Sequence, residues 1–484
     1  MTHPGVIAAG HRLTAEAGAR VLRDGGNAVD AAIAAVAMAC VCEPVLCSPG
    51  GGSFAMVRDP ADESVTLLDA FAHTPRRRAD LPAESVRTVH ADFGTTHQEF
   101  RIGPGTTAAP GLFDGLAALA AQYGTEPIAH LVTDAVRAAR DGVEITPFQH
   151  DLFDVVRAIT TATPSARELY LIDGHLMPVG ATLRNPGLAD ALELLARDGF
   201  AGSDVGAAAL EQQQRGHLTP DDIASFTVIE RTPLEVRVNN DRVLLNPPPA
   251  VGGALIAHTL RQLATTSWVE LARAINATGA LLRESNGDLD LLAALAGSPV
   301  RQRGTTHISV VDADGMACAV TTSNGEGNGE IVDGFGFMLN NVLGEDDVNP
   351  LGDEWPVDTR LSSMMCPTLI EHHDGRITAM GSGGSSRIRS AISQVAARLC
   401  LDNSSLRTAV DAPRMHADGR HLDVEPIDDP TVLDELLRTF PDHRLWQAPA
   451  LYFGGVHAVR LESDGSFVGV GDQRRDGEAI VVPD

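Results

Sequence analysis

Long helical patterns of apolar residues alternate with short strand patterns along this chain. Apolar residues have helical spacing over 14–24, and the stretch 28–42 is apolar on nearly every face, which is typical of a buried helix. Asn27 and Asp30, three residues apart, predict a capping box at the start of that second helix. Further helices are predicted over 113–124, 129–141, 188–199, 252–264, 268–284 and 387–401.

Strand patterns are concentrated in the second part of the chain. The strongest pattern is a hairpin, with strands over 308–311 and 316–321 on either side of an Asp-Gly turn. Other strands are predicted over 54–57, 335–339, 369–371 and 377–380. The segment 285–304 is polar and contains Gly297, Ser298 and Pro299 in succession, so it predicts a connector that leads to the hairpin.

Thr305 opens this hairpin and directly follows a glycine. If the chain were cut before Thr305, this residue would carry both a hydroxyl nucleophile and its own base, the new α-amine. The pKa of a free α-amine is about 7.7–8.0, so a usable fraction is unprotonated at neutral pH. The sequence therefore predicts a site for a self-cleaving hydrolase at this strand.

The register of the hairpin decides which residue faces Thr305. A two-residue turn at 314–315 pairs Thr305 with Asn324, whereas a turn at 313–314 pairs it with Thr322. Ser323 lies within about one residue of Thr305 in either case, at a Cβ separation of roughly 5–8 Å. A second hydroxyl is therefore expected beside the nucleophile or its amine.

Two further segments offer groups for this chemistry. A glycine loop over 381–386 precedes the predicted helix 387–401, and backbone N–H groups at a helix start favour negative charge. The amides of Gly384 and Ser385 are the candidates for stabilising an oxyanion. Ser362 and Ser363 could bind a substrate carboxylate. Each motif alone is also typical of an ordinary turn or loop.

Composition narrows the class of protein. The chain has 484 residues, of which 44% are apolar, so its length fits about three domains or one large α/β unit. A net charge of −27 disfavours nucleic acid and anionic membranes as partners. The N-terminus lacks a secretory signal pattern and the longest apolar run is too short to span a bilayer, so we expect a cytoplasmic protein.

The cysteines do not suggest a cofactor site. There are six of them, too few for a disulfide framework in a chain of this length. Cys40, Cys42 and Cys47 lie close together in sequence, but their spacing is not that of a zinc site. We interpret them as small buried apolar residues, and we expect neither a metal nor a cofactor.

Taken together and in order, these motifs resemble the γ-glutamyltranspeptidase family of N-terminal nucleophile hydrolases. The resemblance begins at 25–32 with Gly-Gly-Asn-Ala-Val-Asp-Ala-Ala and continues with Glu43-Pro44 and the glycine run 50–52. It then covers Thr305-Thr306-His307 and the motifs at 339–341, 361–364, 381–385 and 413–416. The resemblance implies an α/β fold, a four-layer αββα sandwich, built from the intertwined segments 1–304 and 305–484 after self-cleavage.

The same resemblance implies roles for individual residues. Thr305 would be the nucleophile, Ser323 the hydroxyl that contacts its amine, and the amides of Gly384 and Ser385 the oxyanion hole. The implied substrate contacts include Ser362, Ser363 and Asn324. The acid that binds a substrate amine stays open among Glu345, Asp346 and Asp347.

The chain departs from the family at one substrate contact. Relatives that act on γ-glutamyl groups carry an arginine for the substrate α-carboxylate near the position of Phe71, and Arg76, Arg77 and Arg78 come several residues later. An apolar ring in place of a bidentate guanidinium removes a strong carboxylate contact. We therefore expect a small-molecule substrate other than ordinary glutathione.

Three functions remain open from the sequence. The first is a γ-glutamyltransferase-like, self-processing acyl hydrolase or acyltransferase whose acyl-enzyme is released by water or an amine. The second is a carbon–carbon bond hydrolase of the same family, from the branch found in pathways to 4-alkylproline-containing antibiotics. The third is an unprocessed pseudoenzyme that only binds a ligand.

Overall fold

The computed structural model describes residues 3–92, 97–284, 304–345, 354–419 and 421–483. Two large antiparallel sheets form its centre. The first sheet has seven strands in the order β10, β3, β2, β14, β13, β1, β22. Their bounds are β1 Gly5–Ala9, β2 Gly52–Arg58, β3 Val65–Ala70, β10 Ile229–Arg231, β13 Thr306–Asp312, β14 Ala317–Ser323 and β22 Glu478–Val482.

The second sheet has six strands in the order β11, β12, β15, β16, β20, β21. Their bounds are β11 Leu234–Val238, β12 Asp241–Leu245, β15 Thr368–Glu371, β16 Ile377–Gly383, β20 Gly455–Leu461 and β21 Phe467–Val470. Both sheets combine strands from before and after position 305. The two parts of the chain are therefore interleaved within each sheet.

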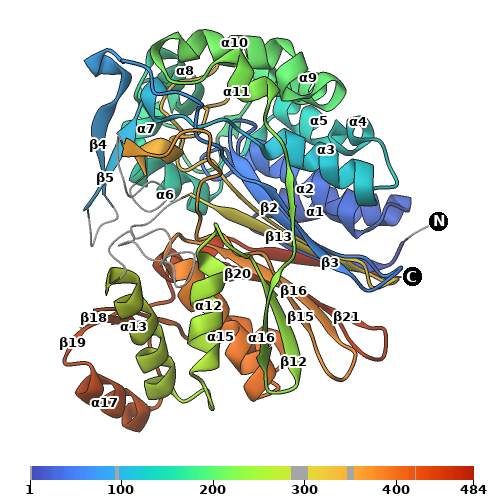
Figure 1. Ribbon diagram of the computed structural model, residues 1–484, viewed down its shortest axis with the longest axis vertical. Coiled ribbons are helices and arrows are strands. Elements are labelled where there is room, and N and C mark those ends of the chain that lie inside the picture. Colours follow the sequence, from blue (N-terminus) through green and yellow to red (C-terminus); the bar gives the residue numbers. More distant parts are fainter. Residues whose placement is uncertain (1–2, 93–96, 285–303, 346–353, 420, 484) are drawn as a thin grey trace.

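Helices cover the outer face of each sheet, which gives the four layers αββα (Figure 1). β13 and β14 of the first sheet pack on β16 of the second. The helices that contact the first sheet include α1 Arg12–Asp24, α2 Ala28–Cys42 and α3 Leu112–Tyr123, and α5 Thr133–Asp141 and α9 Pro186–Gly202 pack outside them. Those that contact the second include α12 Gly252–Arg261 and α15 Arg387–Leu401, and α13 Trp268–Glu284 packs beside α12. This architecture confirms the predicted fold class.

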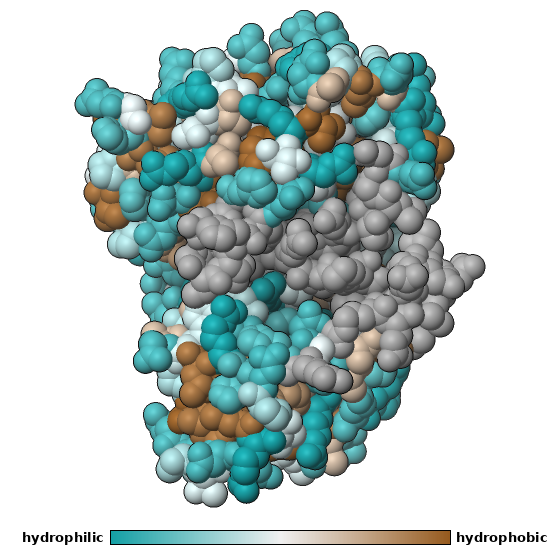
Figure 2. Space-filling view, turned by 90° about the vertical axis from the view of Figure 1, so that its left-hand side faces the viewer, coloured by the Kyte–Doolittle hydropathy of each residue, from teal (hydrophilic) through white to brown (hydrophobic). Residues whose placement is uncertain are grey.

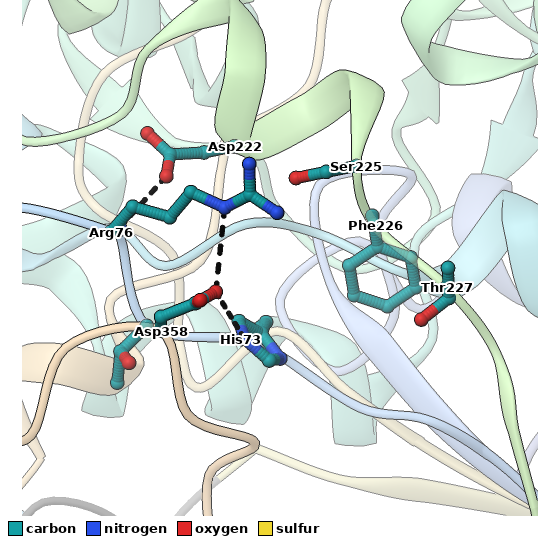
Figure 3. A pocket seen from close by; sticks show the side chains of 8 residues that line it. His73, Arg76, Asp222, Ser225, Phe226, Thr227 and Asp358 are labelled. Carbon is teal, nitrogen blue, oxygen red and sulfur yellow. Dashed lines mark hydrogen bonds and ion pairs between the residues drawn. The ribbon is translucent and has the colours of Figure 1, made fainter.

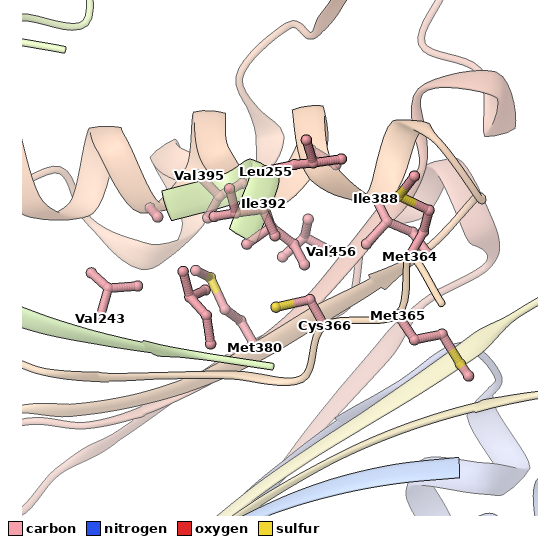
Figure 4. Close-up of a cluster of buried hydrophobic side chains, with 14 of the residues drawn as sticks. Val243, Leu255, Met364, Met365, Cys366, Met380, Ile388, Ile392, Val395 and Val456 are labelled. Carbon is pink, nitrogen blue, oxygen red and sulfur yellow. The ribbon is translucent and has the colours of Figure 1, made fainter. Parts of the chain in front are cut away.

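An aliphatic core fixes the second sheet to its helices. Figure 4 shows Val243, Met380 and Val456 of the sheet facing side chains of α12 and α15. Met364, Met365 and Cys366 belong to the same buried cluster. Because these three residues directly follow Ser362 and Ser363, the core anchors the segment that carries the candidate substrate-binding serines.

Several local predictions can be compared with the observed elements. The capping box of Asn27 and Asp30 at the start of α2 is confirmed, as is the full burial of α2. The helix expected over 129–141 is instead divided into α4 Ile128–Leu131 and α5. The strand expected over 335–339 is wrong, because glycines with positive φ at 334 and 336 interrupt the extended chain and only isolated bridges form there.

The surface is largely polar, as the charge of the chain suggests. Hydrophilic residues predominate on the face shown in Figure 2, and apolar patches are limited in extent. The described large apolar side chains that are exposed are Ile172, Val179, Val357, Leu445 and Val481. Within the described ranges, no helix has the length and apolarity that crossing a bilayer requires.

Candidate active site

The hairpin that carries Thr305 lies in the middle of the first sheet. β13 pairs with β14 so that Thr306 faces Thr322, and continuing this register by one residue places Thr305 opposite Ser323. Both predicted two-residue turns are wrong, because the loop has three residues, 313–315, and Gly315 adopts a φ of 82°. An odd loop length shifts the register to the position between the two predicted ones.

The peptide between Gly304 and Thr305 is buried, and Gly304 is held by hydrogen bonds at both its carbonyl and its amide. The Ser323 hydroxyl donates a hydrogen bond to the Gly304 carbonyl oxygen at 2.7 Å. The amide of Gly304 donates to Oε1 of Glu326 at 2.9 Å. Thr305 is only 4% exposed. The bond that self-cleavage would break is therefore fixed, and its carbonyl is polarised by a hydroxyl donor.

Only glycine fits directly before Thr305. A Cβ atom at Gly304 would collide with the backbone carbonyl oxygens of Gly325 and Val45. Any side chain at position 304 would therefore push the carbonyl away from the Ser323 hydroxyl. The close approach of three backbone segments explains the glycine that precedes Thr305.

The turn after β14 brings amide and carboxyl groups to this peptide. Asn324 is fully buried, and its side-chain amide has no hydrogen-bond partner within the part of the chain that the structure describes. Gly325 has a φ of 62°, and the position of its missing Cβ is occupied by Oδ1 of Asn341 and Oε1 of Glu345. Glu345 therefore lies beside the site, whereas Asp346 lies outside the described residues.

The glycine loop 381–386 contacts Thr305 from the second sheet. A Cβ atom at Gly383, the last residue of β16, would collide with the Thr305 carbonyl oxygen. Gly384 and Ser385 follow with φ values of 117° and 53°, and α15 begins two residues later. Ser385 holds a left-handed conformation that is unfavourable for a residue with a side chain. The structure thus places Gly383, the residue before the two candidates for the oxyanion hole, against Thr305.

A buried arginine that the sequence did not indicate supports this loop. Nη1 of Arg475 lies 3.4 Å from the Thr305 carbonyl oxygen, and the side chain packs against Gly383 and Gly455. Burial lowers the pKa of Arg475 to about 10, so the guanidinium keeps its charge at neutral pH. Arg475 therefore places a positive charge near the Thr305 carbonyl, at the start of β13.

An ion-pair network holds the segment that carries this arginine. Asp472 pairs with Arg414 at 2.5 Å and with Arg474 at 3.2 Å, and Arg474 also pairs with Glu425 at 2.6 Å. All four side chains are buried. Arg414 belongs to the motif at 413–416, so that motif acts on the site by fixing the backbone beneath it.

A buried carboxyl group, that of Glu43, lies beside the first residue of β13. Glu43 accepts a hydrogen bond from the Thr14 hydroxyl at 2.9 Å, and its second oxygen faces Gly10 together with the Thr306 hydroxyl. Burial raises the pKa of Glu43 to about 7. The Glu43-Pro44 motif thus places a carboxyl group with a pKa near neutrality beside Thr306, the residue that follows Thr305.

The two candidate carboxylate-binding serines differ in their environment. The Ser363 hydroxyl accepts a hydrogen bond from the amide of Met365 at 3.1 Å, and its carbonyl accepts from Val251 and Gly252. The Ser362 hydroxyl oxygen is buried and has no hydrogen-bond partner among the described residues. Of the two, Ser362 has the hydroxyl that a ligand could still engage.

Phe71 occupies a packed position between the sheets. Its ring stacks on that of Phe54 at a centroid distance of 5.4 Å and is 1% exposed. Its backbone adjoins Gly52, which pairs with Ser323 across β2 and β14. The Phe71 backbone therefore lies near β14, and its ring serves as core packing in the uncut chain.

A polar cavity of about 260 Å³ opens further out along the same segment (Figure 3). Arg76 enters this cavity, where its Nε lies 3.4 Å from Asp358, whose carboxylate also meets His73 at 3.3 Å. Arg78, by contrast, donates to the Trp355 carbonyl. Arg76 and Arg78 thus contact Asp358 and Trp355 rather than the Gly304–Thr305 peptide.

No metal centre is found in the part of the chain that the structure describes, since no three His, Cys, Asp or Glu side chains are grouped to hold an ion. Cys40, Cys42 and Cys47 are buried, as interpreted from the sequence, and the sulfurs of Cys40 and Cys47 are 3.4 Å apart. The site consists instead of hydroxyl, amide, carboxyl and guanidinium groups around one peptide bond.

Comparisons with known proteins cover nearly the whole chain. The family described as Gamma-glutamyltranspeptidase matches residues 14–278 and 270–482. The glutathione hydrolase proenzyme of Bacillus subtilis (strain 168) is 26% identical over 99% of this chain and 91% of that protein. The acylase ACY 1 proenzyme of Pseudomonas sp. (strain V22) is 25% identical over 99% and 93%.

A solved structure shares the same fold. Cephalosporin acylase from Bacillus halodurans superimposes with a TM-score of 0.80, with 22% sequence identity, over 99% of this chain and 96% of that one. The similarity extends over both sheets and both helical layers, because it spans almost every residue of each chain.

Proposed function

This chain belongs to the gamma-glutamyltranspeptidase family, which includes glutathione hydrolases and acylases similar to it, and we propose that it is a self-processing enzyme with Thr305 as nucleophile. The observation that carries this proposal is the hydrogen bond from the Ser323 hydroxyl to the Gly304 carbonyl, 2.7 Å long. A donor at that oxygen is what attack on the preceding peptide requires.

Self-cleavage would proceed by transfer of an acyl group within Thr305. The Thr305 hydroxyl attacks the Gly304 carbonyl carbon, and the electron pair moves to the oxygen that Ser323 contacts. The oxyanion then collapses, the bond from carbon to the Thr305 nitrogen breaks, the nitrogen takes the proton that the hydroxyl lost, and an ester to the Thr305 side chain remains. Water hydrolyses the ester, which leaves 1–304 with a new carboxylate and 305–484 with a free amine.

The processed enzyme would use the same ester chemistry on a substrate. The Thr305 amine takes the proton of its own hydroxyl, and the oxygen attacks a substrate carbonyl. The amides of Gly384 and Ser385 stabilise the oxyanion, at a loop that already touches Thr305. Water or an amine then releases the acyl group.

Substrate contacts are proposed for the polar groups that surround the nucleophile. Ser362, Ser363, Asn324 and Glu345 would contact the acyl donor, and Asp346 is retained from the sequence alone. Phe71 would contribute an apolar wall in place of a carboxylate-binding arginine. We expect a substrate other than ordinary glutathione, because residue 71 carries an apolar ring where relatives carry the arginine that binds the glutamyl α-carboxylate.

The carbon–carbon bond hydrolase is the second candidate, and the Phe71–Phe54 pair favours it. An apolar wall suits a ketone substrate with a hydrocarbon substituent better than it suits an amino acid carboxylate. The Thr305 oxygen would attack the ketone, the adjacent carbon–carbon bond would break, and the departing carbanion would take a proton. Such a reaction would fit an antibiotic pathway.

One experiment tests the nucleophile. Purified wild-type protein and the Thr305→Ala variant are compared by intact mass and by mapping of the N-termini. We expect fragments 1–304 and 305–484 in the wild type and one unbroken chain in the variant. A single chain in both would contradict self-processing and favour the ligand-binding pseudoenzyme. γ-Glutamyl anilide and an alkyl ketone panel then distinguish the two enzymatic candidates.

A further inference from the structure

The uncut chain presents its own acyl group to the nucleophile. Gly304 is that group, since its carbonyl carbon is the atom that Thr305 would attack. Its oxygen is bound by the Ser323 hydroxyl at 2.7 Å, and its nitrogen donates to Glu326 at 2.9 Å. The nitrogen lies on the carbon next to the reacting carbonyl, so the position of Glu326 records where an α-nitrogen sits in this site.

We propose that Glu326 selects acyl donors with an N–H group on the carbon next to the reacting carbonyl, so that the preferred substrates are α-aminoacyl amides. This inference rests on the proposed role of Thr305. Glu326 would be a specificity residue that contacts the acyl group, and nothing in the reaction chemistry itself would require it.

The covalent geometry of threonine connects the uncut chain to the mature enzyme. The Thr305 nitrogen and hydroxyl oxygen are attached to neighbouring carbons, so the glycyl group moves only a short distance when it is transferred between them. The resulting ester is the same chemical species as an acyl-enzyme formed from a substrate. In a substrate ester the carbonyl oxygen would face the amides of Gly384 and Ser385 in place of Ser323, and the α-nitrogen would remain within reach of Glu326.

The surroundings of Glu326 favour a positively charged α-nitrogen. Glu326 is 3% exposed, and Glu345 and Asn341 bring further oxygens against the adjacent Gly325. A buried carboxylate binds an ammonium through a charge-assisted hydrogen bond, which is about twice as strong as one between neutral groups. Asn324, fully buried with an amide that lacks a partner among the described residues, offers a neutral contact on the same turn.

The proposed preference differs from that for a γ-glutamyl donor. In a γ-glutamyl group, the amine is on the third carbon from the reacting carbonyl, whereas Glu326 contacts a nitrogen on the first. A γ-glutamyl donor would also need a cation for its carboxylate, and Phe71 stands where that cation is expected. Both ends of the site therefore favour a short aminoacyl donor.

The test compares three chromogenic amides with the processed wild-type enzyme, identified by its fragment beginning at Thr305. The amides are glycine p-nitroanilide, its analogue acetic acid p-nitroanilide, which lacks the amine, and γ-glutamyl p-nitroanilide. We expect kcat/KM to be about ten- to a hundredfold higher for the glycine compound than for the other two, because a hydrogen bond to a charged group is lost in each.

Two variants distinguish the loss of the Glu326 contact from a general loss of activity. Glu326→Gln should lower kcat/KM for the glycine anilide about tenfold or more and leave the acetic anilide unchanged. Glu330→Gln is the matched control, because Glu330 lies on the same segment but pairs with Arg215 at 2.8 Å, and its preference should equal that of the wild type. If Glu326→Gln does not fold or process, the wild-type comparison of the three amides decides alone.

The results distinguish failure of the inference from failure of the proposed function. Equal turnover of the glycine and acetic anilides by processed enzyme, or an equal loss of both in Glu326→Gln, would overturn the preference and leave Thr305 as nucleophile. A faster γ-glutamyl reaction would overturn it too. Absence of a fragment beginning at Thr305, or inertness of the processed enzyme towards all three amides, would count against the proposed acyl transfer itself and so against both.

Discussion

Removal of the Ser323 hydroxyl is the perturbation that tests the site most directly. In Ser323→Ala, the Gly304 carbonyl oxygen loses its donor at 2.7 Å, and the amide of Gly325 loses an acceptor at 3.1 Å. The first loss acts on the transition state of self-cleavage, in which that oxygen gains negative charge. The second acts on the folded state, so rate and stability must be measured separately.

The magnitude follows from the value of one oxyanion donor. Losing such a donor costs about 2.7–4 kcal/mol of transition-state stabilisation, which corresponds to a rate about 10²–10³ times lower. We therefore expect the half-time for appearance of the 305–484 fragment to lengthen by that factor. The lost bond to Gly325 should lower the free energy of unfolding by only about 1 kcal/mol.

The assay follows freshly synthesised chain over time by gel and by intact mass, beside urea unfolding of each variant. Ser323→Thr retains a hydroxyl and should restore most of the rate. Thr322→Val is the matched control, because Thr322 donates to the Gly52 carbonyl at 3.1 Å and makes no hydrogen bond to Gly304. If Ser323→Ala cleaves as fast as the Thr322→Val control, the reasoning from this hydrogen bond is refuted.

Two further predictions concern Glu43 and Gly383, which lie next to the start of β13. Burial raises the pKa of Glu43 from 4.5 to about 7, so the folded state binds this proton more tightly than the unfolded chain does. The resulting contribution of about 3 kcal/mol to the free energy of unfolding is present below pH ~4.5 and is lost as the pH rises through ~7. Urea unfolding at pH ~5 and ~8 should show this loss of stability in the wild type and not in Glu43→Gln. An identical pH dependence in both proteins would show that Glu43 is not responsible. Gly383→Ala should slow cleavage and lower the melting temperature, because the new Cβ would displace the Thr305 carbonyl. Gly202→Ala is the control and should behave as wild type, because a Cβ at position 202 meets no atom within 4 Å. Equal cleavage rates in the two variants would contradict the packing of the glycine loop.

Local sequence patterns predicted much of the fold. The helix α2 and its capping box were readable because apolar residues on every face require burial and Asn27 can cap only its own neighbours. The hairpin was readable for a similar reason, since two β-rich runs flank an Asp-Gly turn. Its register was not, because loops of two and three residues share the same turn residues and differ by one position across the ladder.

Tertiary contacts were beyond such patterns. Glu326 follows Thr305 by 21 positions, yet it accepts a hydrogen bond from Gly304 through a turn whose shape depends on Gly325 and Asn341. Arg475 lies 170 residues from Thr305 and reaches it because β20 and the segment after β21 fold back beneath the glycine loop. An Asp followed closely by two arginines at 472–475 was the available signal, but such a run is equally typical of a solvated turn.

The amino-acid sequence by itself determined the succession of elements, the glycine before Thr305 and the family to which the order of motifs points. These features depend on neighbouring residues, whose periodicity and backbone freedom act over a few positions. Only the tertiary structure decided that Ser323 donates to the Gly304 carbonyl, that Glu326 holds its nitrogen and that Phe71 is packed within the core. Those relations depend on the register of each hairpin and on the way that the turn after β14 packs against Asn341, which no run of neighbouring residues determines.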